Sequence, residues 1–172
     1  HFAGTLKWLG LGEAKSKKIS LAFLESFAAL RVFGVIGNLK NFDTIGKLVG
    51  LERLWLGSQS SPDLSILAGM KKLERFHLQF GSATDISPVG DLPKLKALGL
   101  MRVRGLADLS PVASIATLQY LMLEGLKQVT HLPDFGKLKK LRRVHLEIMN
   151  GLETLEGLEK APALEDVIVM EC

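Results

Sequence analysis

Cysteine and long apolar runs are both scarce in this sequence of 172 residues. The single cysteine is Cys172, so no disulfide can form within the chain, and a reducing cytoplasm is the expected location. No apolar run reaches the roughly 18 residues of a membrane-spanning helix. The chain starts at His1 with no initiator Met, and we expect no signal peptide and an N-terminal segment removed either by processing or by the choice of the expressed segment. Apolar residues make up 47 % and charged residues 23 %, which excludes a disordered chain.

A repeat runs through the whole sequence. Each copy matches Leu-x-x-φ-x-φ, where φ is apolar, and the starts are residues 6, 30, 51, 73, 95, 118, 141 and 164, spaced by 24, 21, 22, 22, 23, 23 and 23 residues. Three more apolar residues precede every start after the first, at nine, six and three positions before it. One coil of this kind cannot bury its apolar side alone, so the coils must stack as a solenoid. The repeat therefore predicts parallel strands, right-handed crossovers and a single domain over residues 1–172.

The segments between the predicted strands contain signals for short helices. The stretches DISPV (85–89) and DLSPV (108–112) place a serine before a proline, which predicts that Ser87 and Ser110 are N-caps. The stretch 19–30 is apolar enough for a longer helix, which Ser20 would cap. We expect short helices or 3₁₀ turns on the convex side of the solenoid.

The sequence resembles the leucine-rich-repeat family from Leu6 onward, and the Asp-Ile/Leu-Ser-Pro-Val return resembles its bacterial internalin-like subclass. The resemblance implies an α/β solenoid, a right-handed horseshoe with about eight parallel strands on its concave side. The family has Asn or Cys eight residues after each repeat start, but here only Asn38 and Cys172 fit. Apolar pairs such as Val103 and Leu106 stand there instead, so we expect a packed corner. A secreted or host-directed bacterial effector is the alternative to a cytoplasmic location.

The concave face has an unusual composition. Side chains two, four, six and seven positions after each start are expected to face it. These positions contain both tryptophans, the only tyrosine, four of the seven arginines and none of the fifteen lysines. This composition is typical of protein interfaces, and it predicts a protein–protein interaction module. The candidate binding residues are Trp8, Arg53, Trp55, Arg75, His77, Met101, Tyr120, Met122, Glu124, Arg143, His145 and Glu147.

Catalytic and metal sites are not expected. His77 and His145 would stand three coils apart, about 14 Å, which is too far to share a zinc ion. Glu124 and Glu147 would be neighbours in one column, with Arg143 expected to neutralise them. Cys172 has no histidine that the repeat places beside it, and no phosphate-binding glycine motif occurs. We therefore predict no enzyme, no metal and no cofactor.

Four alternatives remain open. An immunity- or effector-type protein could hold one cognate protein, and a purely structural segment of a larger array is also compatible with the repeat. The uncovered last coil, 164–169, could support self-association. Nucleic acid or another anion could bind at one edge of the sheet, but four arginines against five acids make the concave face itself a poor phosphate site. The lysines of that edge are Lys71, Lys72, Lys94, Lys139 and Lys140.

Overall fold

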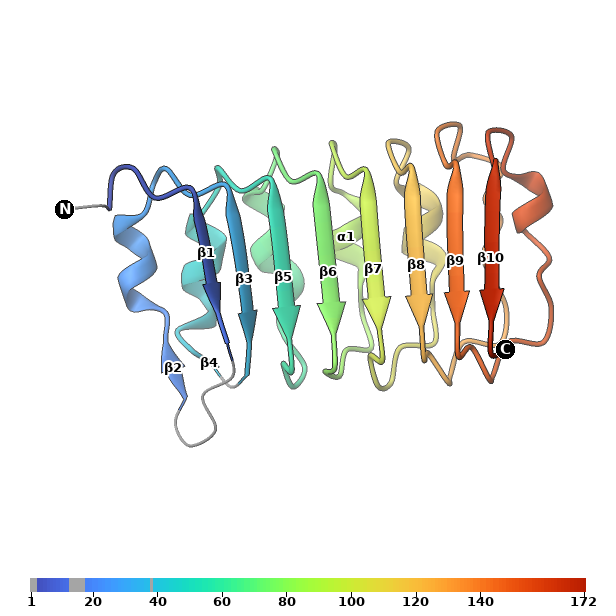
Figure 1. Cartoon of the computed structure of the whole chain (residues 1–172), viewed down its shortest axis with the longest axis horizontal. Helices are drawn as coiled ribbons and strands as arrows, with labels where there is room; N and C mark the ends of the chain where they lie inside the picture. The colour runs from blue at the N-terminus through green and yellow to red at the C-terminus, as the bar shows by residue number, and fades with distance from the viewer. Residues whose placement is uncertain (1–2, 13–17, 38) are drawn as a thin grey trace.

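The computed structural model describes residues 3–12, 18–37 and 39–172. Eight parallel strands form one sheet (Figure 1). Each strand begins two residues after a start of the sequence repeat, and neighbouring strands pair in the same register, which confirms the predicted stacking. The strands in spatial order are β1 (Trp8–Leu11), β3 (Val32–Ile36), β5 (Arg53–Gly57), β6 (Arg75–Gln79), β7 (Ala97–Met101), β8 (Tyr120–Glu124), β9 (Arg143–Glu147) and β10 (Asp166–Met170).

The core lies between the sheet and the return segments. In the third coil, Leu51, Leu54 and Leu56 are fully buried, as the alternation of strand side chains requires. Later coils repeat this arrangement up to the last strand. There Val167 and Val169 occupy core positions but are 44 % and 42 % exposed, because no further coil of the given chain covers them.

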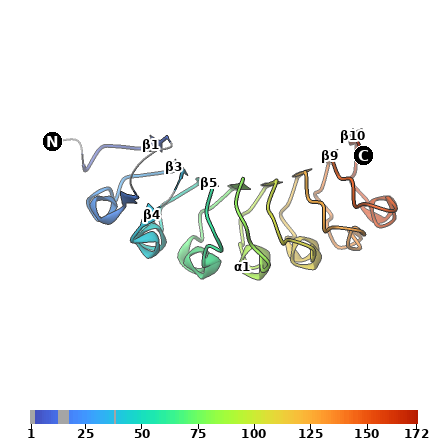
Figure 2. The ribbon, with the colours of Figure 1, turned by 90° about the horizontal axis from the view of Figure 1, so that it is seen from below.

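Short helices cover the convex side (Figure 2), as the sequence predicted. One segment differs: no helix is assigned between β8 and β9, where every residue is described. The longer helix expected over 19–30 is also wrong. Its first two residues form β2 (Ile19–Ser20), which pairs with β4 (Leu39–Lys40), and only one short helix follows. The helices are η1 (Ala22–Ser26), η2 (Phe42–Lys47), η3 (Leu64–Gly69), α1 (Ser87–Gly90), η4 (Ser110–Ser114) and η5 (Leu158–Lys160).

Aspartates rather than serines start several return segments. The backbone N–H of Ser87 donates to Asp85 Oδ1 at 2.7 Å, and that of Ser110 donates to Asp108 Oδ1 at 2.8 Å. The hydroxyls of the two serines donate to the same carboxylates. The pKa of Asp85 is lowered chiefly by the Ser87 hydroxyl and then by its N–H, and the pKa of Asp108 chiefly by the Ser110 N–H and then by its hydroxyl, because these bonds favour the ionised form. The predicted serine N-caps are therefore wrong, because each serine is the first residue of its helix.

The residue seven positions after each repeat start does not belong to the strand. It has a positive φ in every coil from the second to the last, as in Phe80 (54°), Arg102 (52°) and Ile148 (53°). The chain turns there, at the sheet edge where the strands end, so the concave face consists only of the positions two, four and six after each start. Those positions still contain no lysine.

The corner that follows combines packing with one hydrogen-bonded residue. Val103, Leu126 and Met149 are buried, which confirms the packed corner of the later coils. Gln59 differs from this pattern: its buried Nε2 donates to the carbonyls of Gly37 and Gly57 at 2.5 and 2.7 Å. A glutamine thus plays the backbone-bonding role expected of Asn or Cys. Asn38 lies outside the described residues.

Candidate protein-binding face

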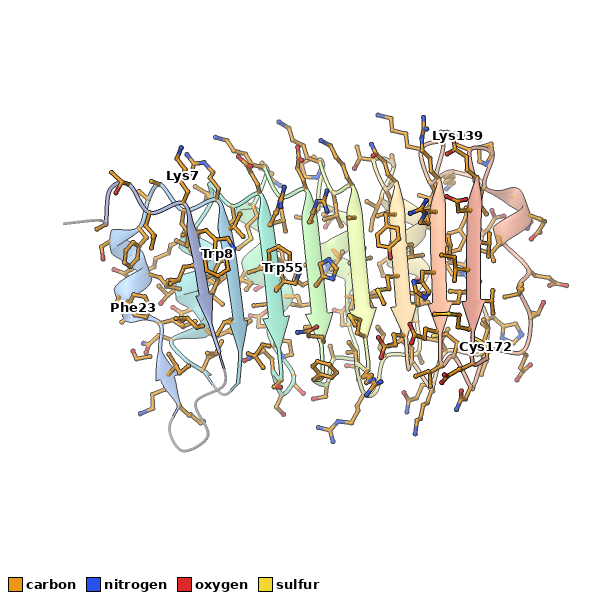
Figure 3. All side chains as sticks on the ribbon, in the orientation of Figure 1. Lys7, Trp8, Phe23, Trp55, Lys139 and Cys172 are labelled. Carbon is orange, nitrogen blue, oxygen red and sulfur yellow. The ribbon has the colours of Figure 1, made fainter. Side chains whose placement is uncertain are left out.

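A stacked aromatic pair occupies the middle of the concave face. Trp55 on β5 and His77 on β6 are register partners. Their rings lie 5.7 Å apart between centroids, with 19° between the planes. Position four after each repeat start points outward, so both side chains point away from the core. Figure 3 shows Trp8 and Trp55 on this same open face.

Glycines flank the aromatic pair on both sides in the same column of the sheet. Because these neighbours have no side chain, the rings lie next to exposed backbone. Gly34 precedes Trp55 in the same column, and Gly99 follows His77. A Cβ at Gly99 would lie only 2.4 Å from His77 Nδ1, so the imidazole covers this glycine. The ring of Trp8 covers Gly10 in the same way, at 2.7 Å from a Cβ placed there. A larger residue at Gly10 or Gly99 would displace the ring that covers it.

Two arginines make this part of the face cationic. Arg53 and Arg75 are register partners on β5 and β6, and both are exposed. Neither forms an ion pair within the described part of the chain. The pKa of His77 is lowered, chiefly because burial disfavours the imidazolium and secondarily because Arg75 repels it. The cluster therefore offers two free guanidinium groups beside a neutral stacked pair.

A shallow hollow lies between the two tryptophans. It has a volume of about 530 Å³ and is lined by Trp8, Trp55, Ile36 and the glycines of β1 and β3. Trp8 is 64 % exposed, the largest exposed fraction among the large apolar side chains of the described chain. Exposed aromatic surface around a bare backbone floor suits an apolar side chain or loop of another molecule.

The C-terminal half of the face is held by ion pairs that differ from those predicted. Arg143 donates to Asp166 Oδ2 at 2.6 and 3.0 Å instead of neutralising Glu124 and Glu147. Glu124 is only 7 % exposed and accepts from Arg102 Nε at 2.7 Å. The expected neutralisation by Arg143 is therefore wrong, because a carboxylate on the next strand lies closer.

The remaining predicted residues form a second, mixed patch. Met122 and His145 are register partners in the central column, and Tyr120 stands beside Arg143. His145 Nε2 lies 3.3 Å from Glu147 Oε2 without the geometry of a hydrogen bond. Met101 is partly exposed on β7, next to Glu124. The structure thus separates the predicted site into three parts. These are Trp8 at one end, the cluster of Arg53, Trp55, Arg75 and His77 (the Trp55 cluster), and this mixed patch.

The lysine edge lies where the strands begin, and Figure 3 shows Lys7 and Lys139 there. All five lysines of the anion hypothesis are exposed. Three cross-coil ion pairs lie along the same edge: Arg31–Glu52, Glu74–Lys96 and Arg142–Glu165. Three carboxylates therefore lie among the cations of this edge, which is not a continuous cationic row.

The described residues contain neither a metal-binding cluster nor a membrane-spanning helix. No group of three or more His, Cys, Asp or Glu side chains in residues 3–12, 18–37 and 39–172 could hold a metal ion. Within the same ranges, no helix has the length and apolar character that crossing a bilayer requires.

Comparison with solved structures places the fold. An internalin (inlF) from Listeria monocytogenes superposes with a TM-score of 0.75 at 23 % identity, over 96 % of this chain and 48 % of that one. Internalin C2 from the same species gives 0.72 at 25 % identity, over 92 % of this chain and 70 % of that one. The fold is an internalin-like leucine-rich-repeat solenoid.

This leucine-rich-repeat fold is shared beyond the internalins. The leucine-rich-repeat domain of the type III effector XopL superposes with a TM-score of 0.69 at 15 % identity, over 96 % of this chain and 69 % of that one. The present chain spans about half the length of the first internalin, which carries further segments. In sequence, the chain matches no family model and no curated protein.

Proposed function

We propose that this leucine-rich-repeat protein binds a partner protein through its concave face, centred on Trp55, His77 and the hollow beside Trp8. The observation that carries the proposal is the exposed aromatic surface beside two arginines that form no ion pair among the described residues, on a face whose sequence positions contain no lysine. Tryptophan and arginine are the residue types that most often dominate binding energy at protein interfaces. The internalin and effector neighbours support the proposal at the level of the fold.

The face also predicts the chemistry of the partner. Arg53 and Arg75 favour a carboxylate opposite the middle of the sheet, because neither guanidinium forms an ion pair with another described residue. The hollow at β1 and β3 favours an apolar side chain or a protruding loop. Near β9 and β10, Arg143 already forms an ion pair with Asp166, so its charge is not available to a partner. We expect that end of the face to contribute to binding through its shape more than through Arg143.

The test compares three forms of the whole chain in capture from source lysate followed by calorimetry on the captured protein. The binding variant combines Trp55→Ala and Arg75→Glu. The matched control is Phe23→Ala, which removes an aromatic side chain that is 42 % exposed on the convex helix η1 (Figure 3).

The expected result is specific capture by the wild type and by Phe23→Ala. Loss of one dominant interface residue costs about 2 kcal/mol or more, which weakens binding about thirtyfold. Equal affinity for all three forms would refute the concave face as the binding surface. Binding that falls steeply with salt and depends on Lys139 and Lys140 instead would support the anion alternative.

The finer roles predicted from the sequence stay proposals. An immunity or effector role requires one tight cognate partner, and the capture experiment tests for it. The cytoplasmic location, the absence of catalysis and self-association through the last coil also stay predictions.

A further inference from the structure

A second groove lies outside the concave face, at the edge where β6 to β9 end. Phe80 and Ile148 form its two ends, and Gly125 lies between them in the same column. The groove has a volume of about 700 Å³ and also contains Arg102, Arg104, Lys127 and Gln128. From Phe80 to Ile148 is three strand steps, about 14 Å, which matches about four residues of an extended peptide.

The two apolar residues at the ends of the groove have a left-handed backbone conformation, which is energetically unfavourable for residues with a side chain. Phe80 has φ of 54° and Ile148 has φ of 53°, a conformation that glycine and asparagine adopt most readily. Phe80 does not recover this cost by burial, because its side chain is 48 % exposed. This left-handed position recurs in every coil from the second to the last, so it belongs to the turn itself, and at Phe80 it leaves an aromatic ring exposed at the groove.

The charge of the groove is positive. Arg104 and Lys127 are exposed and form no ion pair within the described residues. Arg102 is held by Glu124 at 2.7 Å, and its guanidinium carbon lies 6.0 Å from the centre of the Phe80 ring. The acids near the groove are Glu124, which Arg102 neutralises, and Glu171, which follows Ile148 in the same column. Two cations thus remain available beside the exposed Phe80 and the partly exposed Ile148.

We propose that this groove, lined by Phe80, Arg104, Lys127 and Ile148, binds a short acidic segment of a partner protein that also carries apolar side chains. The carboxylates of the segment would meet Arg104 and Lys127, and its apolar side chains would pack on Phe80 and Ile148. The groove is separate from the Trp55 cluster, so it does not depend on the concave face being a binding surface.

An extended peptide fits the groove better than single-stranded nucleic acid. Single-stranded nucleic acid is held by several bases stacked on aromatic rings, whereas Phe80 is the one aromatic residue among the described residues that line the groove. Ile148 offers no stacking surface at all. Carboxylates spaced along a peptide with apolar neighbours match both the cations and the apolar ends of the groove.

The experiment measures fluorescence anisotropy of labelled probes with the whole chain. The probes are a short peptide that alternates Glu with Leu and Phe, the same peptide with Lys in place of Glu, and an oligouridylate. The groove variants are Phe80→Asn and the double change Arg104→Glu, Lys127→Glu. The charge control is Lys139→Glu, Lys140→Glu on the opposite edge, and Trp55→Ala tests independence from the concave face.

The acidic peptide should bind the wild type, the lysine-edge control and Trp55→Ala alike. The double charge reversal should weaken it about tenfold. Phe80→Asn should weaken it similarly without lowering the thermal midpoint, because asparagine relieves the left-handed strain. No binding of the acidic peptide, equal binding by all variants, or tighter binding of the lysine peptide or the oligouridylate overturns the proposal. Loss in Trp55→Ala alone would assign the peptide to the concave face.

Discussion

Replacing Gly99 by alanine should displace His77 and disrupt the aromatic pair, whereas the same change at Gly34 should not. Both glycines lie in the central column of the sheet, one on each side of the Trp55–His77 pair. A Cβ at Gly99 would lie 2.4 Å from His77 Nδ1, but a Cβ at Gly34 would lie 3.7 Å from the nearest Trp55 atom, an ordinary contact. The imidazole must therefore move outward by roughly 1 Å.

The two substitutions should have different effects on stability. Glycine to alanine in a compatible backbone stabilises a protein by about 0.4–1 kcal/mol, and Gly34→Ala should show this gain. At Gly99 the same gain is offset by the lost stacking of His77 on Trp55, about 0.5–1.5 kcal/mol. The variants should differ by about 1 kcal/mol, or roughly 3 °C in thermal midpoint for a domain of this size.

Thermal unfolding and an NMR titration of the histidines check this prediction together. In Gly99→Ala the imidazole moves toward solvent, so the pKa of His77 should rise toward its ordinary value, because burial is the main cause of its lowering. Gly34→Ala should leave that pKa unchanged. Equal thermal midpoints and equal His77 titration curves in the two variants would show that the glycine does not position the ring.

Three further predictions concern the hydrogen bonds and the ion pair that stabilise the turns of the solenoid. Gln59→Leu should cost about 1–3 kcal/mol in urea unfolding, because the buried Gly37 carbonyl loses its Gln59 donor and the Gly57 carbonyl keeps only the N–H of Gly37. Replacing Asp85 and Asp108 by asparagine should flatten the acid side of the stability curve. Their lowered pKa means that their contribution is present above about pH 4 and is lost on acidification, which urea midpoints between about pH 6 and 3 would show. Glu124→Gln should cost about 1 kcal/mol by freeing Arg102, with a smaller cost in high salt; an equal cost at all salt concentrations would contradict an ionic role.

The regular part of the fold was readable from the spacing of leucines. The repeat has a period of about 22 residues, and the residues at its start and three and five positions later are apolar. Only stacked parallel coils bury all three of these columns. Leu54 and Leu56, three and five positions after a start, are buried in this way in the structure. The strand positions of Trp55, His77 and Arg75 followed from the same count. Gln59 could also have been noticed, since it stands in the column that normally carries a backbone-bonding residue.

The tertiary structure decided what the repeat could not. Ion pairing depends on which carboxylate of a neighbouring coil lies nearest. Arg143 therefore pairs with Asp166, and Arg102 pairs with Glu124. Stacking of Trp55 on His77 depends on side-chain torsions and on the space that Gly99 leaves. The sequence by itself determined the solenoid and its faces, because periodic burial leaves no other solution. Only the folded chain determined the edge groove, because the left-handed backbone at Phe80 and Ile148 is a property of how the coils turn.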